Sequence, residues 1–85
     1  MIRVSVISPE RVLFEGEAGG VVAPAFDGEV GILTGHAPMM TLLGTGTLRL
    51  TGAAADVPQR FRVSGGFLQV VDDQVRVVTE QAEIG

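Results

Sequence analysis

The sequence predicts an all-β domain, folded as a flattened β-sandwich or barrel and formed by residues 1–85 as a single unit. Three observations predict this fold. Short runs of residues alternate between apolar and polar side chains, as expected for strands with one buried face. Turn-forming residues separate these runs at roughly even spacing, which is typical of sandwiches and barrels. No segment repeats its apolar residues with the 3.6-residue period of an amphipathic helix.

The first expected strand is Ile2–Ile7, where apolar residues alternate with polar ones. Pro9 ends this strand, because proline cannot donate a hydrogen bond to a neighbouring strand. Residues 12–14 resume an apolar run, and residues 15–17 offer a bulge or a bend. A pair of glycines then allows a kink before the apolar residues 21–23.

The expected strands of the second half of the chain are 39–43, 47–51, 60–63, 67–71 and 74–79. Between them we expect turns at 44–46 and 52–56, and a reversal or bulge at the glycine pair 65–66. The pair 72–73 is a tight-turn signal. Residues 80–84 are expected to form one frayed helical turn at most.

The composition excludes several classes of protein. The chain has no cysteine, so it forms no disulfide and no cysteine metal site. Its net charge is −4 and its six basic residues are all arginine, which argues against binding nucleic acid or anionic lipid. Without lysine, the chain cannot carry a lipoyl or biotinyl group. The N-terminus has no signal-peptide layout and no apolar run reaches about 18 residues, so we expect a cytoplasmic location.

Residues 27–38 differ from the rest of the chain. These twelve residues contain two carboxylates, three glycines, the only histidine and a proline. The glycines predict a backbone that bends repeatedly, while the apolar residues between them favour burial. We therefore expect a loop anchored by its apolar middle, which presents Glu29 and His36 at fixed positions on the surface.

This stretch, DGEVGILTGHAP, resembles the signature of the epsilon subunit of F-type ATP synthase, called delta in mitochondria. Two flanking segments are also similar to that family: VSVISPE at 4–10 to its opening strand, and SGGF at 64–67 to its turn. The order and spacing of the three segments agree, and the resemblance covers residues 2 to 82. Thr34 stands where the family usually has proline, so we expect a slightly looser loop.

The resemblance implies a β-sandwich of about ten short strands, like the N-terminal domain of the epsilon subunit. It also implies a non-catalytic subunit of the central stalk, which couples the gamma shaft to the membrane c-ring in proton-driven ATP synthesis and needs no cofactor. Such a subunit would lie at the cytoplasmic face of the bacterial inner membrane. Glu29 would contact the polar loops of the ring and His36 would contact the shaft. The implied partner-contacting residues are Glu29, Gly31, His36, Ala37, Pro38 and Met39.

Many members of this family continue into a C-terminal helical hairpin that restrains ATP hydrolysis. The sequence reaches Gly85 without such a pattern. We therefore expect a domain that lacks the helical hairpin and couples without inhibiting through it.

Two other functions remain open from the residues. Asp27, Glu29 and His36 allow a small metal-dependent enzyme, although one histidine with two carboxylates is a poor zinc site. That histidine has no identified orienting partner for a Ser-His-Asp set. The second alternative is a free-standing ligand-binding module, for example for sugar. Such modules usually bind through exposed aromatic platforms, and the chain has four phenylalanines but no tryptophan or tyrosine.

Two further features have an ordinary structural interpretation. Met39, Met40, Leu42 and Leu43 form the largest apolar cluster outside the plain strands, and we favour core packing over an adaptable contact surface. The glycine pair 65–66 is interpreted as a backbone requirement, because a phosphate site would need a following helix N-terminus.

Overall fold

The computed structural model describes residues 1–85 as ten strands without a helix. The strands are β1 (Ile2–Ile7), β2 (Val12–Ala18), β3 (Gly20–Ala25), β4 (Gly28–Leu33), β5 (Met39–Leu42), β6 (Thr45–Thr51), β7 (Arg60–Ser64), β8 (Phe67–Val71), β9 (Gln74–Val78) and β10 (Gln81–Ile84). The predicted all-β class is confirmed. Since every element is a strand, the structure offers no helix that could traverse a bilayer.

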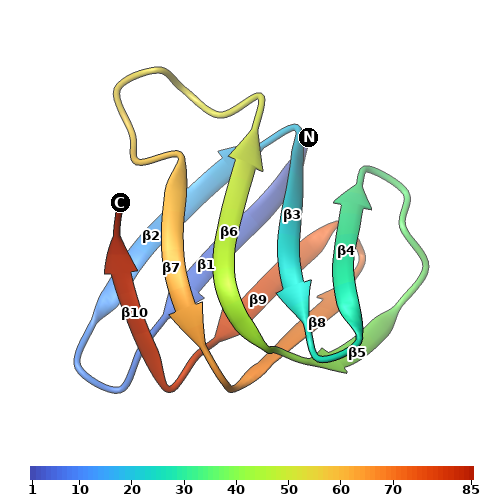
Figure 1. Ribbon diagram of the computed structural model, residues 1–85. Helices are drawn as coiled ribbons and strands as arrows, with labels where there is room; N and C mark the ends of the chain where they lie inside the picture. Colours follow the sequence, from blue (N-terminus) through green and yellow to red (C-terminus); the bar gives the residue numbers. More distant parts are fainter.

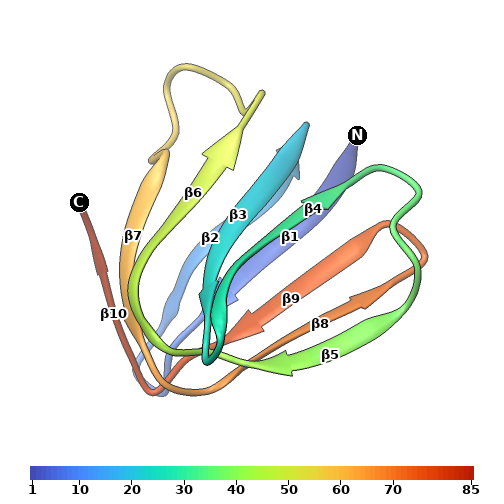
Figure 2. The ribbon, with the colours of Figure 1, turned by 45° about the vertical axis from the view of Figure 1, so that its right-hand side comes forward.

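Two five-stranded sheets pack face to face as a sandwich (Figure 1). One sheet has the order β10-β7-β6-β3-β4 and is called the β4 sheet below; the other has the order β2-β1-β9-β8-β5 and is called the β5 sheet. The edge strands β4 and β5 lie on the same side of the sandwich, joined by the loop 34–38 (Figure 2). Strands β10 and β2 meet on the opposite side. Each sheet therefore offers one outer face and two edges.

The core fills the space between the sheets with one side of each strand. Eighteen buried hydrophobic residues form it as one continuous cluster. Phe61 is fully buried at its centre, and its ring lies 6.1 Å from that of Phe14 with a tilt of 58°. The polar side chain of Thr79 is also buried, and its hydroxyl donates to the Gln81 carbonyl at 2.9 Å and accepts from the Ser64 amide at 3.3 Å. A close-packed interior of this kind makes the body stiff.

The predicted turns 65–66 and 72–73 are confirmed by the backbone. Gly65 and Gly66 have φ angles of 71° and 94°, between β7 and β8. Asp72 and Asp73 have φ angles of 50° and 60°, and they join β8 to β9. At 72–73, two successive positive φ angles are the geometry of hairpin turns that match the twist of the flanking strands, whereas the glycine pair carries the chain from one sheet to the other.

Two expectations are wrong in detail. Strand β2 runs without interruption through residues 15–17, where a bulge or bend is predicted. The irregularity lies nearer the start of β2. Val6 pairs with Phe14 and Ile7 pairs with Val12, which leaves Leu13 as the extra residue of a bulge. Residues 45 and 46, expected in a turn, already belong to β6.

The C-terminal segment is a strand and not a helical turn. Gln81–Ile84 forms β10, which pairs antiparallel with β7 from Gln81 opposite Ser64 to Ile84 opposite Phe61. A helical turn of five residues would form too few backbone hydrogen bonds to offset the conformational entropy lost when its residues are ordered. Pairing with the open edge of β7 satisfies more of the backbone, and it brings Ala82 against the core.

Candidate functional site

The segment 27–38 is not the single loop that the glycines predict. Phe26 and Asp27 form the turn of a hairpin, and Gly28–Leu33 is strand β4, paired antiparallel along its whole length with β3. Only residues 34–38 form a loop. The segment folds as a strand because its residues alternate: Val30 and Ile32 turn toward the core, while the residues between them face outward.

Glu29 lies on the outer face of β4, near the β3–β4 turn. Its side chain is 58% exposed, and Glu29 Oε2 lies 3.4 Å from Arg49 Nη1. Arg49 comes from β6, so the pair reaches across β3, where Val22 pairs with both Arg49 and Gly31. An exposed ion pair at this distance holds the carboxylate loosely, so Glu29 remains available to a partner.

Gly31 follows on the same outer face and differs from the glycines around it. Gly28 and Gly35 have φ angles of 131° and 83°, which explains why they are glycine. Gly31 has no positive φ angle, and a Cβ added there would meet nothing within 4 Å. The fold therefore gives no reason for glycine at this position.

The loop 34–38 is held by backbone contacts at its base and by one side chain from the other sheet. The His36 amide donates to the Leu33 carbonyl at 3.1 Å, and the Gly35 amide donates to Asp73 Oδ1 at 2.7 Å. The His36 ring is half-buried, and its Nδ1 lies 2.7 Å from the Ala37 carbonyl, to which it donates. Ala37 and Pro38 are exposed. Asp73 thus anchors the loop 34–38, while Val30 and Ile32, from the apolar middle that the sequence suggested as the anchor, hold the preceding strand β4 to the core.

Asp73 is the one residue of this region that sequence reasoning missed. Its role as a turn former is predicted, but the residue that it contacts lies 38 positions away along the chain. Only the arrangement of the β8–β9 turn beside the loop brings them together. No local signal in the sequence could have found this contact.

The predicted site residues fall into two groups. Glu29 and Gly31 lie on β4, whereas His36, Ala37 and Pro38 lie in the loop beyond its far end, followed by the half-buried Met39 at the start of β5. Four residues of strand separate Glu29 from the end of β4, which corresponds to about 13 Å. Asp27, Glu29 and His36 therefore do not gather, and no group of three acidic or histidine residues could hold a metal ion.

The apolar cluster at 39–43 is divided by the alternation of β5. Leu43 is buried and Met39 packs against the core, as favoured from the sequence. Met40 and Leu42 face outward and are 64% and 62% exposed. The prediction of core packing is therefore wrong for these two residues.

Leu42 is part of an apolar row that crosses the whole outer face of the β5 sheet. Each member pairs directly with the next one, from β5 through β8, β9 and β1 to β2. The apolar row consists of Leu42, Phe67, Val78, Ile7 and Val12. Its two ends, Leu42 and Val12, are 62% and 55% exposed.

The surface carries two shallow hollows, and neither lies at the segment 27–38. Their volumes are about 230 Å³, over β7 and β10, and about 280 Å³, beside the β8–β9 turn. Both are smaller than the roughly 300–1,000 Å³ of typical small-molecule pockets, and polar residues dominate their lining. Neither hollow therefore has the size or the apolar lining of a typical small-molecule site.

Curated relatives align with most of this chain. Residues 1–85 match the family described as the β-sandwich domain of the ATP synthase delta/epsilon chain. The ATP synthase epsilon chain of Rhodopirellula baltica is 48% identical over 81 residues, which cover 95% of this chain and 62% of the relative. That of Syntrophomonas wolfei is 42% identical over 82 residues, which cover 96% of this chain and 59% of the relative. The chain thus spans about 60% of the length of these relatives.

Solved structures share the fold. A chain of the Euglena gracilis mitochondrial ATP synthase, from an assembly described as OSCP/F1/c-ring, superposes with a TM-score of 0.85 at 24% identity, over 98% of this chain and 52% of that chain. A chain of the Tetrahymena thermophila central stalk and c-ring gives a TM-score of 0.81 at 16% identity, over 98% of this chain and 66% of that chain. These similarities show the fold, and the family match over residues 1–85 shows that the chain belongs to the ATP synthase delta/epsilon family and forms its β-sandwich domain.

Proposed function

We propose that this domain is a non-catalytic rotor subunit of an F-type ATP synthase, which couples the gamma shaft to the c-ring during proton-driven ATP synthesis. The observation that carries the proposal is the segment from Glu29 to Met39, most of whose residues are exposed and which overlaps the DGEVGILTGHAP stretch that resembles the family signature. This segment lies on an edge strand and a loop, so a neighbouring protein can reach it.

The two groups of residues in this segment suit two different neighbours. Glu29 and Gly31 form a small, carboxylate-bearing surface near the β3–β4 turn, suited to donors or cations on the polar loops of the ring. His36, Ala37, Pro38 and Met39 form the second group beyond the other end of β4, and we assign them to the gamma shaft. A subunit that transmits torque needs two such separate surfaces.

The physical properties of the body support a mechanical role. The backbone makes 51 hydrogen bonds with itself, and no buried side-chain nitrogen or oxygen lacks a partner. Such a body resists deformation, so a load on one surface reaches the other with little loss. We assign the reactions of ATP to other subunits, since His36 lies beyond the far end of β4 from Asp27 and Glu29.

The proposal places the domain at the cytoplasmic face of the bacterial inner membrane, as a peripheral member of the complex. Attachment would come from contacts with protein and not from lipid, because the chain carries a net charge of −4 and would be repelled by anionic headgroups. The same charge argues against nucleic acid as a partner.

Co-purification from the native cell tests this proposal. A tagged copy of the chain is expressed, membranes are solubilised in mild detergent, and the proteins that elute with the tag are identified. The gamma subunit and the c-ring subunit are expected in the eluate in stoichiometric amounts. Elution of the folded chain without either subunit would contradict the proposal.

A further inference from the structure

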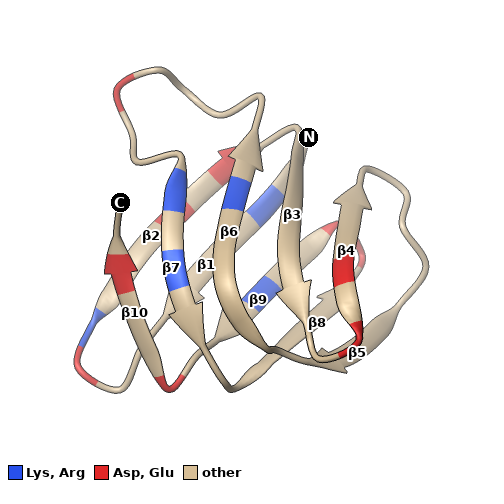
Figure 3. Cartoon of the chain, viewed as in Figure 1, with Lys and Arg blue, Asp and Glu red and all other residues tan.

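Three arginines gather on the outer face of the β4 sheet. Arg49 of β6 pairs directly with Arg60 of β7, and Arg62 lies two residues further along β7 on the same face, opposite Thr47 (Figure 3). Half of the six basic residues of the chain therefore lie on two adjacent strands. We call Arg49, Arg60 and Arg62 the arginine cluster.

This arrangement is unfavourable for the isolated domain. Like charges directly opposite each other on one face of a sheet are destabilising. Only Arg49 has an acidic partner, Glu29, and no carboxylate oxygen lies within 4.0 Å of the Arg60 or Arg62 guanidinium. The fold gains nothing from the pair Arg49–Arg60, so its presence points to a partner.

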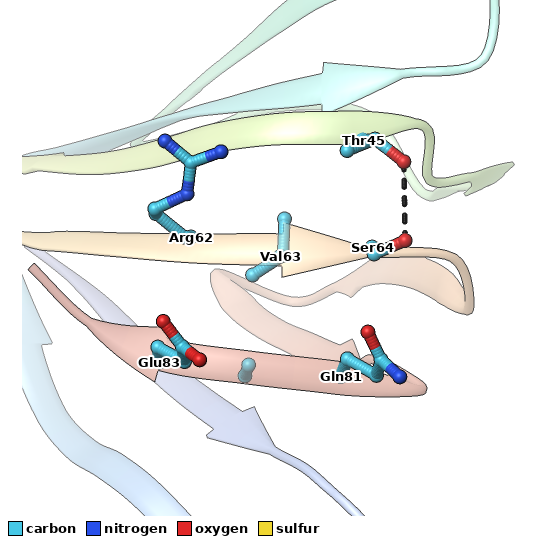
Figure 4. Close-up of a pocket in the computed structure, with 7 residues that line it drawn as sticks. Thr45, Arg62, Val63, Ser64, Gln81 and Glu83 are labelled. Carbon is cyan, nitrogen blue, oxygen red and sulfur yellow. Dashed lines mark hydrogen bonds between the residues drawn. The ribbon is translucent and has the colours of Figure 1, made fainter.

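The surroundings of Arg62 offer further hydrogen-bond donors. Glu83 of β10 pairs with Arg62 in register, but the guanidinium extends toward β6 and away from the Glu83 carboxylate (Figure 4). Beside it lies the hollow of about 230 Å³, which Glu83 also lines and to which Gln81 contributes an amide. Thr45 and Ser64 contribute two hydroxyls that are hydrogen-bonded to each other at 3.1 Å, which leaves one of their two protons free to donate. Carboxylate oxygens would find both a cation and neutral donors there.

The geometry selects a short acidic segment of protein over a long polyanion. Glu29 and Glu83 flank the arginine cluster on its two sides, and the whole chain carries a charge of −4. These charges would repel a nucleic acid or an anionic membrane that extended past the cluster. Outward side chains of residues two apart on a strand, such as Arg60 and Arg62, are roughly 6.6 Å apart, which is also the spacing of alternate side chains in an extended peptide.

We propose that the outer face of β6 and β7 binds an extended segment of a partner protein that carries carboxylates at alternate positions. Arg60 and Arg62 each receive one carboxylate, through the two parallel hydrogen bonds that a guanidinium can donate. Arg49 adds positive charge at the edge of the site. This binding surface lies on strands other than β4 and the loop 34–38, and the proposal does not depend on the rotor role.

A titration followed by backbone amide NMR tests the proposal. The probe is an eight-residue peptide of alternating glutamate and alanine, with an otherwise identical glutamine–alanine peptide as its control. The glutamate peptide is expected to shift the amides of residues 45–51 and 60–64 at low salt, and the glutamine peptide is not. Binding should weaken as ionic strength rises, because exposed charges are screened.

Substitutions then locate the binding surface. Arg60→Gln and Arg62→Gln are each expected to weaken binding of the glutamate peptide by roughly two- to fivefold. Arg76→Gln is the matched control, because it removes the same charge from the outer face of the other sheet. It should leave the affinity within about 1.5-fold of the parent, since only the long-range charge changes. Arg62→Lys keeps the charge but loses the paired hydrogen bonds, so its effect should be intermediate.

Several results would overturn the proposal. An equal loss of affinity in Arg62→Gln and Arg76→Gln would mean that net charge alone drives binding. Equal binding of the two peptides would remove the role of carboxylates. Tighter binding of a DNA duplex or of phosphatidylserine vesicles to residues 45–64 would identify a different class of partner. The arginines are on the surface, so each single variant should keep the unfolding midpoint of the parent. An unchanged affinity of Arg60→Gln and of Arg62→Gln for the glutamate peptide would reject the site.

Discussion

Two glycine-bearing regions of this domain look alike in the sequence and serve different purposes in the structure. At the β7–β8 turn, Gly65 and Gly66 both have positive φ angles, and a Cβ on Gly66 would collide with the Val78 carbonyl. On β4, Gly31 has an ordinary backbone, and a Cβ would meet nothing within 4 Å. Both regions resemble segments of the same family. The first therefore reflects a requirement of the fold, whereas the fold does not require the second, which we propose is set by contact with a partner.

Gly66→Ala should produce the largest loss of stability in this comparison. The φ angle of 94° is unfavourable for alanine, and the new methyl group would press on backbone atoms of Val78 and Thr79, which cannot move aside. We expect the free energy of unfolding to fall by about 3–5 kcal/mol, a large part of the stability of a small domain. Urea unfolding measures this change. A loss below about 1 kcal/mol would show that the turn is not constrained as described.

Gly65→Ala should cost less, because its constraint is mainly conformational. Its φ angle is 71°, and the atoms nearest to an added Cβ belong to the flexible end of the Glu80 side chain. We expect a loss of about 1–2 kcal/mol in the same unfolding measurement. Gly65→Asn is the control, since asparagine tolerates the left-handed region and should lose less. Equal losses in the two variants would point to crowding instead.

Asp73→Gly should loosen the loop 34–38 without unfolding the domain. Glycine tolerates the φ angle of 60°, but the substitution removes the side-chain oxygen that accepts the hydrogen bond from the Gly35 amide. We expect hydrogen exchange of that amide to accelerate about fivefold, equivalent to about 1 kcal/mol for the lost hydrogen bond. Asp73→Asn keeps an acceptor oxygen and should exchange at nearly the parent rate. Unchanged exchange in both variants would mean that Asp73 does not anchor the loop.

Gly31→Ala should have the smallest effect on stability. The position has no strained backbone and open space around it, so alanine restricts the unfolded chain at no cost to the folded one. We expect the free energy of unfolding to rise by about 0.4–1 kcal/mol or to stay unchanged within about 0.5 kcal/mol. A loss above about 1 kcal/mol would mean that the fold does require glycine here, and the contrast with Gly66 would disappear.

Most of the sandwich could be predicted from local patterns. Strands such as Ile2–Ile7 alternate clearly, and the glycine and aspartate pairs mark their turns directly. Strand β4 resembles a loop in the sequence because Gly31 occupies an outward position, where a larger polar residue would have revealed the alternation, and a second glycine, Gly28, begins the strand. Strand β10 could not be predicted because it depends on the free edge of β7, which no local window contains.

The candidate surfaces were harder to predict than the fold. Glu29 and His36 could be selected because their residue types stand out in a glycine-rich stretch. The apolar row and the arginine cluster could not, because each takes its members from different strands and exists only through the register between them. Pairing register follows from the complete fold, so these surfaces become visible only in three dimensions.

The most direct test of the central claim substitutes Gly31 with valine and measures stability and association together. Valine suits an outward strand position, so Gly31→Val should keep the unfolding midpoint of the parent. The tagged variant should nevertheless recover at least about tenfold less gamma and c-ring subunit from native membranes, equivalent to about 1.4 kcal/mol of binding free energy. Full recovery of both subunits by the folded variant would contradict the account, because it would show that the outer surface of β4 at Gly31 does not contribute to binding of either subunit.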